Sequence, residues 1–219
     1  MRLQSAIFDM DGTLLDSMPT WRELGPTFLK EAGITATPEQ DRMLHTLADC
    51  DVIPYLREVC GLPWSQQEII DQIIQRMEIF YSSQVRPKPG LEKFLSILKM
   101  EGVWMYVATA THRRLTEKAL KTAGIDHYFR GIVTSADAGN HKSESADIYE
   151  MAMRRLQSNK RDTVIFEDSL AAIRTAKAAG FRVAGVYNPA AEADQAAIQA
   201  EADYYLRSFE EMFDATDLG

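Results

Sequence analysis

Ile7-Phe8-Asp9-Met10-Asp11-Gly12-Thr13 is the stretch that decides the fold class of this chain. Its apolar start is typical of a buried strand, and this strand ends abruptly at Asp9 and Asp11. Gly12 permits the sharp turn that follows. Carboxylates placed directly after a strand lie at the carboxyl edge of an open α/β sheet, where such sheets bind ligands. The stretch therefore predicts a functional site rather than a piece of core.

The spacing of Asp9 and Asp11 indicates a metal ion. Two neighbouring carboxylates repel each other unless a cation or a proton lies between them. Mg²⁺ suits the pair because this hard ion binds carboxylate and backbone oxygens. A bound ion would keep the Asp9 carboxylate charged and able to attack an electrophile. The competing interpretation is an ordinary turn, since Asp and Gly are common turn residues.

Length and composition limit the classes of protein that are possible. With 219 residues and 46% apolar content, the chain can bury one core domain with an insertion. A net charge of −8 argues against nucleic-acid binding, which needs a basic surface. Cys50 and Cys60 are too few for a disulfide framework and lack zinc-site spacing. Without a signal-peptide or membrane-spanning pattern, we expect a cytoplasmic protein that does not bind membranes.

The segment 17–86 has helical periodicity and no convincing strand. One helix signal is an apolar stripe formed by Trp21, Leu24, Phe28 and Leu29. Two capping boxes mark further helix starts, one made by Thr37 with Gln40 and the other by Ser65 with Glu68. We therefore predict a small helical domain at 17–86, inserted into a core domain made of 1–16 and 87–219.

After residue 87, helices and β-rich runs alternate along the chain. Strands are expected at 104–109, 132–134, 163–166 and 182–186, with a last short one at 204–206. Helices are expected at 91–100, 113–123, 146–156 and 170–179, and an alanine-rich helix at 190–202. Such alternation predicts an α/β fold, a doubly wound, Rossmann-like parallel sheet with helices on both faces.

Polar residues follow three of the later strands. Thr109 and Ala110 precede a helix, where a hydroxyl and exposed N–H groups can bind an anion. Lys142 comes after the strand at 132–134 and could balance negative charge. Glu167 and Asp168 end the strand at 163–166, and neighbouring strands would bring them beside the first two aspartates. Taken singly, each residue also has an ordinary explanation, as a strand threonine, a solvated lysine or a helix cap.

Taken together and in this order, these motifs resemble those of the haloacid dehalogenase-like superfamily, most of whose members are phosphatases. The resemblance implies that Asp9 is a nucleophile that becomes an aspartyl phosphate and that Asp11 is a general acid and base. It implies that Thr109, the N–H of Ala110 and Lys142 bind the phosphoryl group. The metal ligands it implies are Asp9, Asp11, Glu167 and Asp168. Of these, we expect Asp168 to bind Mg²⁺ directly, while Glu167 could act through water.

The helical insertion and one departure refine the resemblance. An insertion directly after the first strand matches the helical cap of the subfamily that includes phosphoglycolate phosphatase and β-phosphoglucomutase. Relatives commonly carry two prolines around the motif lysine, whereas residues 142–147 read Lys-Ser-Glu-Ser-Ala-Asp, which is one residue longer and contains no proline. The reach of Lys142 is therefore open at the level of sequence.

We predict a Mg²⁺-dependent phosphatase that hydrolyses a small phosphorylated metabolite, with the oligomeric state left open. The alternative is a phosphotransferase similar to β-phosphoglucomutase, which needs a cation on its cap. Segment 45–54 offers two acids and no Lys or Arg, which favours hydrolysis, although Arg42 or Arg57 could serve. A dehalogenase is disfavoured, because carbon–halogen cleavage needs no Mg²⁺ and so would not need the cluster of acids. An idle binding or regulatory module is disfavoured because unused buried charge destabilises a fold.

Overall fold

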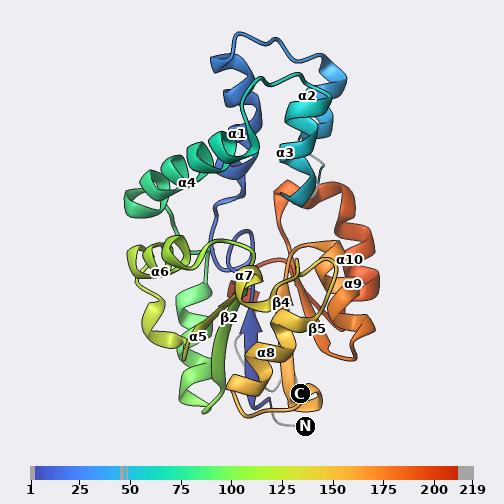
Figure 1. Cartoon of the computed structure of the whole chain (residues 1–219). Coiled ribbons are helices and arrows are strands. Elements are labelled where there is room, and N and C mark those ends of the chain that lie inside the picture. Colours follow the sequence, from blue (N-terminus) through green and yellow to red (C-terminus); the bar gives the residue numbers. More distant parts are fainter. Residues whose placement is uncertain (1–2, 45–46, 48, 212–219) are drawn as a thin grey trace. The chain divides into compact units, whose positions relative to one another are not determined.

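The computed structural model describes residues 3–44, 47 and 49–211 (Figure 1). The chain forms two compact units, Met1–Asp16 with Val85–Gly219, and Ser17–Gln84. Within the first unit, the segments that flank Ser17–Gln84 are joined: the Asp16 N–H donates to the Arg86 carbonyl at 3.0 Å. No helix among the described residues is long and apolar enough to cross a membrane.

The first unit is built on a six-stranded sheet in the order β3-β2-β1-β4-β5-β6. All neighbouring strands are parallel. The strands are β1 (Ser5–Phe8), β2 (Trp104–Thr109), β3 (Ile132–Thr134), β4 (Thr163–Glu167), β5 (Arg182–Val186) and β6 (Tyr204–Leu206). The prediction of a doubly wound parallel sheet is therefore confirmed, including the short last strand.

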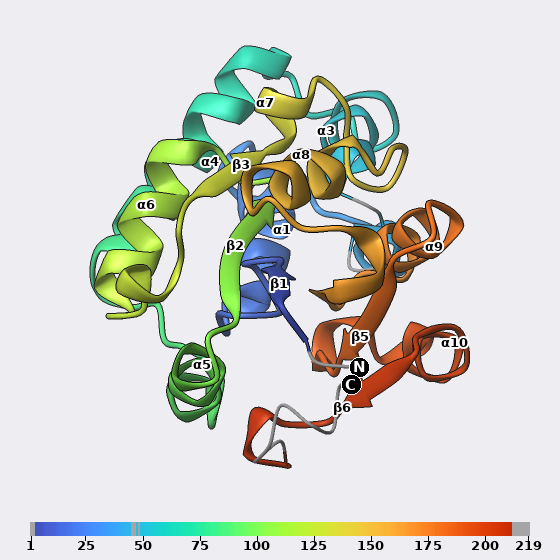
Figure 2. The same ribbon diagram turned by 90° about the horizontal axis from the view of Figure 1, so that it is seen from below.

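Helices cover both faces of this sheet (Figure 2). One face carries α5 (Leu91–Met100) and α6 (Arg113–Thr122). The other carries α8 (Asp147–Arg155), α9 (Leu170–Ala178) and α10 (Gln195–Glu201). Short elements complete the unit: α7 (Ser135–Ala138) and the 3₁₀ turns η1 (Asp126–Tyr128), η2 (Lys160–Asp162), η3 (Pro189–Asp194) and η4 (Phe209–Glu211).

The central strand β1 is buried on both faces because its side chains alternate between two cores. Ile7 belongs to a hydrophobic cluster with residues of α8, α9 and α10. Phe8 points to the opposite face, where its ring stacks on Phe166 at 4.4 Å between centroids and meets Phe94 edge-on. Apolar contacts on both faces hold the end of β1 in place, and with it the residues that follow.

The second unit is helical. It contains α1 (Met18–Glu31), α2 (Pro38–Leu44), α3 (Asp49–Glu58) and α4 (Gln66–Ser83). Both predicted capping boxes form: Ser65 with Glu68 before α4, and Thr37 with Gln40 before α2. Of the 45–54 segment, His45, Thr46 and Ala48 lie outside the described residues.

The predicted helix at 190–202 is wrong in its first half. Residues Pro189–Asp194 form a 3₁₀ turn with a non-helical Ala191, and the α-helix begins only at Gln195. Side-chain hydrogen bonds replace the helical ones here: Asn188 Oδ1 accepts from the Ala190 N–H, and Gln195 Nε2 donates to the Ala191 carbonyl. Alanine content alone therefore overestimated the helix.

Candidate active site

The register of the sheet brings the predicted residues to one edge. Strand β1 lies between β2 and β4, with Phe8 level with Val107 and Phe166. The ladder continues one residue further, since the Asp9 N–H donates to the Phe166 carbonyl at 3.0 Å. Asp9 and Glu167 each come directly after this level on neighbouring strands, so their side chains lie together.

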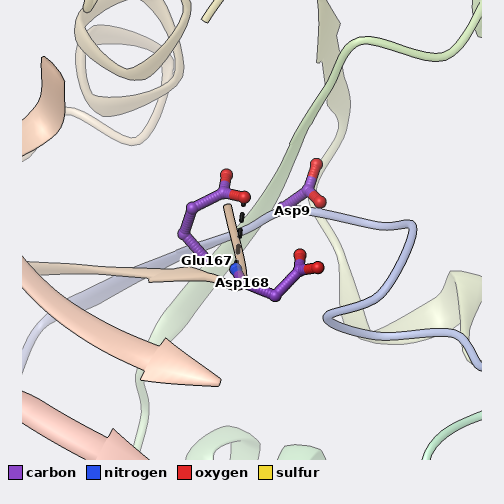
Figure 3. A group of neighbouring side chains, drawn as sticks. All are labelled: Asp9, Glu167 and Asp168. Atoms are coloured by element: carbon purple, nitrogen blue, oxygen red, sulfur yellow. Dashed lines mark hydrogen bonds between the residues drawn. The ribbon is translucent and has the colours of Figure 1, made fainter. Parts of the chain in front are cut away.

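Asp9, Glu167 and Asp168 form a buried cluster of acids (Figure 3). Each offers a carboxylate oxygen, and these three oxygens lie within 4.8 Å of one another. In Figure 3 the side chains come from two neighbouring strand ends and lie close together above the sheet edge. This is a group that could hold a metal ion.

Lys142 lies within this cluster. Its Nζ is 2.6 Å from Asp9 Oδ1 and 3.0 Å from Glu167 Oε2, and the residue is 6% exposed. Side-chain hydrogen bonds shape its proline-free loop: His141 Nδ1 and Ser143 Oγ are 2.7 Å apart, and Thr175 Oγ1 donates to the Ser143 carbonyl at 2.9 Å. The loop thus brings Lys142 to Asp9 without prolines.

Burial and mutual repulsion dominate the electrostatics of the cluster. Burial, and then the Glu167 charge, raise the pKa of Asp9 well above its usual value, and Lys142 offsets only part of this. Burial lowers the pKa of Lys142, but Asp9 and Glu167 outweigh it and raise that pKa well above the ordinary value. Three carboxylates share one ammonium, so the cluster carries more acidic than basic groups. Its carboxylate oxygens are the ligands that a divalent cation such as Mg²⁺ prefers.

The carboxylate of Glu167 is surrounded by donors. Besides Lys142, it accepts the Tyr149 hydroxyl at 2.9 Å on Oε2. Its Oε1 accepts the backbone N–H groups of Asp168 at 3.2 Å and Ser169 at 3.1 Å. Glu167 is fully buried, and burial raises the pKa of its carboxyl although Lys142 and the Ser169 N–H favour the charged form.

Asp168 has a different set of partners. Its Oδ1 accepts the Thr13 hydroxyl at 2.8 Å, and its Oδ2 accepts the Asn188 amide at 2.6 Å. Gly12 passes close beside this carboxylate with φ +81°, and a Cβ at Gly12 would overlap both Asp168 and Asn188. The Gly-Thr pair after Asp11 thus supplies both the close approach and a hydrogen bond.

The Asp11 carboxylate is not part of the three-acid cluster. Its Oδ2 accepts the Thr111 hydroxyl at 2.7 Å. The Thr111 N–H in turn donates to Thr109 Oγ1 at 3.1 Å, which ties the end of β2 to the loop after β1. Thr109 is buried at the end of β2, and Ala110 follows it before α6. The predicted phosphate-binding pair therefore lies next to the partner of Asp11.

Two polar residues at the site, Tyr149 and Asn188, were not singled out from the sequence, whereas Thr111 follows directly on the predicted pair Thr109 and Ala110. Asn188 follows a strand at the carboxyl edge, as Thr111 does, so strand-end position could have drawn attention to it. The signal for Tyr149 is weaker. It is a tyrosine on the apolar face of α8, and a buried phenol needs a hydrogen-bond partner.

Comparison with known proteins identifies the family. The model of the haloacid dehalogenase-like hydrolases matches residues 6–186, and the chain belongs to this family. It is similar to a phosphorylated carbohydrates phosphatase of Thermotoga maritima, 26% identical over 84% of this chain and 85% of that protein. It is also similar to hexitol phosphatase B of Escherichia coli, to which it is 27% identical over 96% of this chain and 95% of that protein.

A solved structure has a similar fold over the whole chain. The crystal structure of CbbY from Rhodobacter sphaeroides in complex with phosphate superposes with a TM-score of 0.82 at 25% identity, covering 100% of this chain and 99% of that one. The family and its named phosphatases make the chain an enzyme of the phosphoric monoester hydrolase class.

Proposed function

We propose that the protein is a Mg²⁺-dependent phosphatase that hydrolyses a small phosphate monoester through an aspartyl phosphate on Asp9. The observation that carries this proposal is the buried contact of 2.6 Å between Asp9 and Lys142, inside the cluster completed by Glu167 and Asp168. A carboxylate nucleophile beside a buried ammonium fits a reaction in which negative charge builds up on a phosphoryl group.

In the first step, an Asp9 oxygen attacks phosphorus in line with the leaving oxygen. The bond from this carboxylate to phosphorus forms as the ester P–O bond breaks. Lys142 Nζ contacts the Asp9 carboxylate, so its ammonium is proposed to hold an oxygen of the group that is transferred to Asp9. The Thr109 hydroxyl and the Ala110 N–H are the further donors proposed for that group.

Asp11 supplies and recovers the proton. It protonates the departing alkoxide, and as a carboxylate it then takes a proton from the water that attacks the phosphorylated Asp9. The water oxygen bonds to phosphorus as the bond from phosphorus to the Asp9 oxygen breaks, so inorganic phosphate leaves, the Asp9 carboxylate is restored and Asp11 is protonated again. The hydrogen bond from Thr111 to Asp11 supports this role because it orients the carboxylate on the side of Thr109.

Mg²⁺ fits the donor set of the cluster, and Asp9 and Asp168 are the residues proposed to bind it directly. When bound, the ion would neutralise charge on the phosphoryl oxygens and lower the repulsion between the acids. Glu167 is proposed to act mainly by holding Lys142, since Lys142, Tyr149 and two backbone N–H groups already occupy its carboxylate. The part of Asp11 in metal binding stays a prediction.

For the substrate, we propose a sugar phosphate or a polyol phosphate. The support is the similarity to phosphatases named for phosphorylated carbohydrates and hexitols. The helical segment 17–86 is proposed to be the cap that selects the substrate, flanked by core segments 1–16 and 87–219.

The test is phosphate release from a panel of sugar phosphates, polyol phosphates, phosphoglycolate, nucleoside monophosphates and a chromogenic ester, with Mg²⁺ and with chelator. Asp9→Asn is the matched control, because it keeps the size of the side chain and removes the nucleophile. We expect Mg²⁺-dependent release, highest with sugar or polyol phosphates, and none from the variant.

Two outcomes would change the proposal. A folded Asp9→Asn variant with full activity would overturn the nucleophile. Conversion of β-glucose 1-phosphate to glucose 6-phosphate without phosphate release would favour the phosphotransferase instead.

A further inference from the structure

We propose that Asn188 is a positioning residue of the metal site, holding the Asp168 carboxylate in the orientation that binds the ion. This inference rests on the proposed function, because it concerns the Mg²⁺ that Asp168 is proposed to bind. Asn188 follows β5, it is 4% exposed, and its Nδ2 donates to Asp168 Oδ2 at 2.6 Å. It belongs to none of the motifs that the sequence comparison with the superfamily rests on.

The direction of the Asn188 amide is fixed by its other contact. Asn188 is the N-cap of the turn Pro189–Asp194, and its Oδ1 accepts the Ala190 N–H at 3.0 Å. A backbone N–H can only donate, so the atom facing Ala190 must be the oxygen. The amide nitrogen must then face Asp168, as the distance between Nδ2 and Oδ2 indicates. The contact is therefore a donor on a carboxylate and not a repulsive pair of oxygens.

The backbone that carries Asn188 is held on both sides. Lys88 Nζ donates to the carbonyl of Tyr187, the residue before it. Gln195 Nε2 donates to the carbonyl of Asn188 itself at 3.2 Å, and the Tyr205 hydroxyl donates to Gln195 Oε1 at 2.7 Å. Since Gln195 begins α10 and Tyr205 lies in β6, the edge of the sheet sets the position of the amide.

The two hydrogen bonds to Asp168 orient its carboxylate, and Lys88 and Lys142 act on it through their charges. Thr13 occupies Oδ1 and Asn188 occupies Oδ2, and both donors are neutral. With one donor on each oxygen, rotation of the carboxylate would break both hydrogen bonds. Outer partners of this kind set the geometry of metal ligands, and losing one typically costs about 10- to 100-fold in metal affinity or activity.

The test is a calorimetric Mg²⁺ titration of the substrate-free protein and of two variants, Asn188→Ser and Asn188→Thr. Both hydroxyls can still accept the Ala190 N–H, and both residues suit the extended backbone of Asn188 (φ −137°, ψ 119°). Neither side chain is long enough to replace the amide on Asp168. We expect the Mg²⁺ Kd to rise about 10- to 100-fold. In phosphate-release assays we expect a matching rise in the Mg²⁺ requirement, with kcat largely restored at saturating Mg²⁺.

Asn159→Ser is the matched control. Asn159 also caps a 3₁₀ turn, its Oδ1 accepts the Asp162 N–H at 3.1 Å, and its Nδ2 donates to Asp162 Oδ2 at 2.7 Å, but none of these groups belongs to the acid cluster. This variant should lose similar thermal stability and keep the wild-type Mg²⁺ affinity. The comparison separates loss of a cap from loss of a carboxylate orientation.

Each outcome decides the matter. Wild-type Mg²⁺ affinity in both Asn188 variants would overturn the role of Asn188 and leave the proposed function intact. Failure of both variants to fold would assign Asn188 to the fold alone and also overturn the inference. If the wild-type protein itself bound no Mg²⁺, the proposed function would fail, and the inference with it.

Discussion

Glu167 and Asp168 are neighbours in sequence, both are buried, and yet their surroundings differ in kind. Glu167 accepts from a charged ammonium, a phenol and two backbone N–H groups. Asp168 accepts one neutral donor on each oxygen, Thr13 and Asn188. The first carboxylate is paired with an ammonium at hydrogen-bond distance, whereas the second is held by neutral hydrogen-bond donors.

This difference indicates that Glu167 and Asp168 have different tasks, one in holding Lys142 and the other in binding a cation. A carboxylate matched by Lys142 serves to hold that lysine beside Asp9. A carboxylate that is oriented by neutral donors remains attractive to a cation. On this account, changes around Glu167 act on stability and on Lys142, and changes around Asp168 act on Mg²⁺ binding.

The largest expected effect comes from Lys142→Met. This change leaves Asp9 and Glu167 buried without the ammonium that contacts both, and stranding a buried charge costs about 3–5 kcal/mol of unfolding free energy. Denaturant unfolding in chelator measures the loss, and Mg²⁺ should restore part of it. The control Lys177→Met breaks a partly exposed pair with Asp203 and should cost at most about 1 kcal/mol. Equal losses in the two variants would contradict the account.

The next effect comes from Gly12→Ala on the Asp168 side. Gly12 has φ +81°, and a Cβ there would overlap the Asp168 carboxylate and the Asn188 amide. Gly102→Ala is a matched control, because Gly102 has φ +80° and nothing within 4 Å of the added Cβ. We expect about 1–2 kcal/mol of strain in the control and a larger loss at Gly12. Mg²⁺ affinity should fall in Gly12→Ala and not in Gly102→Ala. Equal losses of stability and of Mg²⁺ affinity in the two variants would contradict the close approach of Gly12 to Asp168.

Tyr149→Phe should have the smallest effect. It removes one hydrogen bond to Glu167, whose carboxylate keeps Lys142 and two backbone donors. We expect a loss of about 0.5–1.5 kcal/mol in unfolding free energy. Mg²⁺ affinity measured by calorimetry should stay at the wild-type value. A tenfold weaker Mg²⁺ affinity would show that the two carboxylates are not separate in function.

Much of the fold could be predicted because its signals are local. The apolar run before Asp9 and the alternation after residue 87 gave the parallel sheet, and capping boxes marked two helix starts. The turn Pro189–Asp194 could not be predicted, because side-chain hydrogen bonds of Asn188 and Gln195 replace helical ones there. Such bonds depend on which groups meet in space.

The residues of the acid cluster could be expected to meet because they follow strand ends, and β1 lies between β2 and β4. Their individual surroundings could not. Sequence order does not show that Tyr149 reaches Glu167 or that the Asn188 amide faces Asp168. It also left open whether the loop without prolines carries Lys142 to Asp9, which it does. The roles of these residues in catalysis stay predictions.

The most direct test is a calorimetric Mg²⁺ titration of Asp168→Asn and Glu167→Gln side by side, with folding checked by thermal unfolding. Both changes remove one charge and keep the shape of the side chain. The account predicts that Asp168→Asn weakens Mg²⁺ binding more than about 100-fold, beyond the usual effect of an outer partner, whereas Glu167→Gln weakens it less than about tenfold, below that usual range. Equal losses, or a greater loss in Glu167→Gln, would contradict the separation of the two carboxylates.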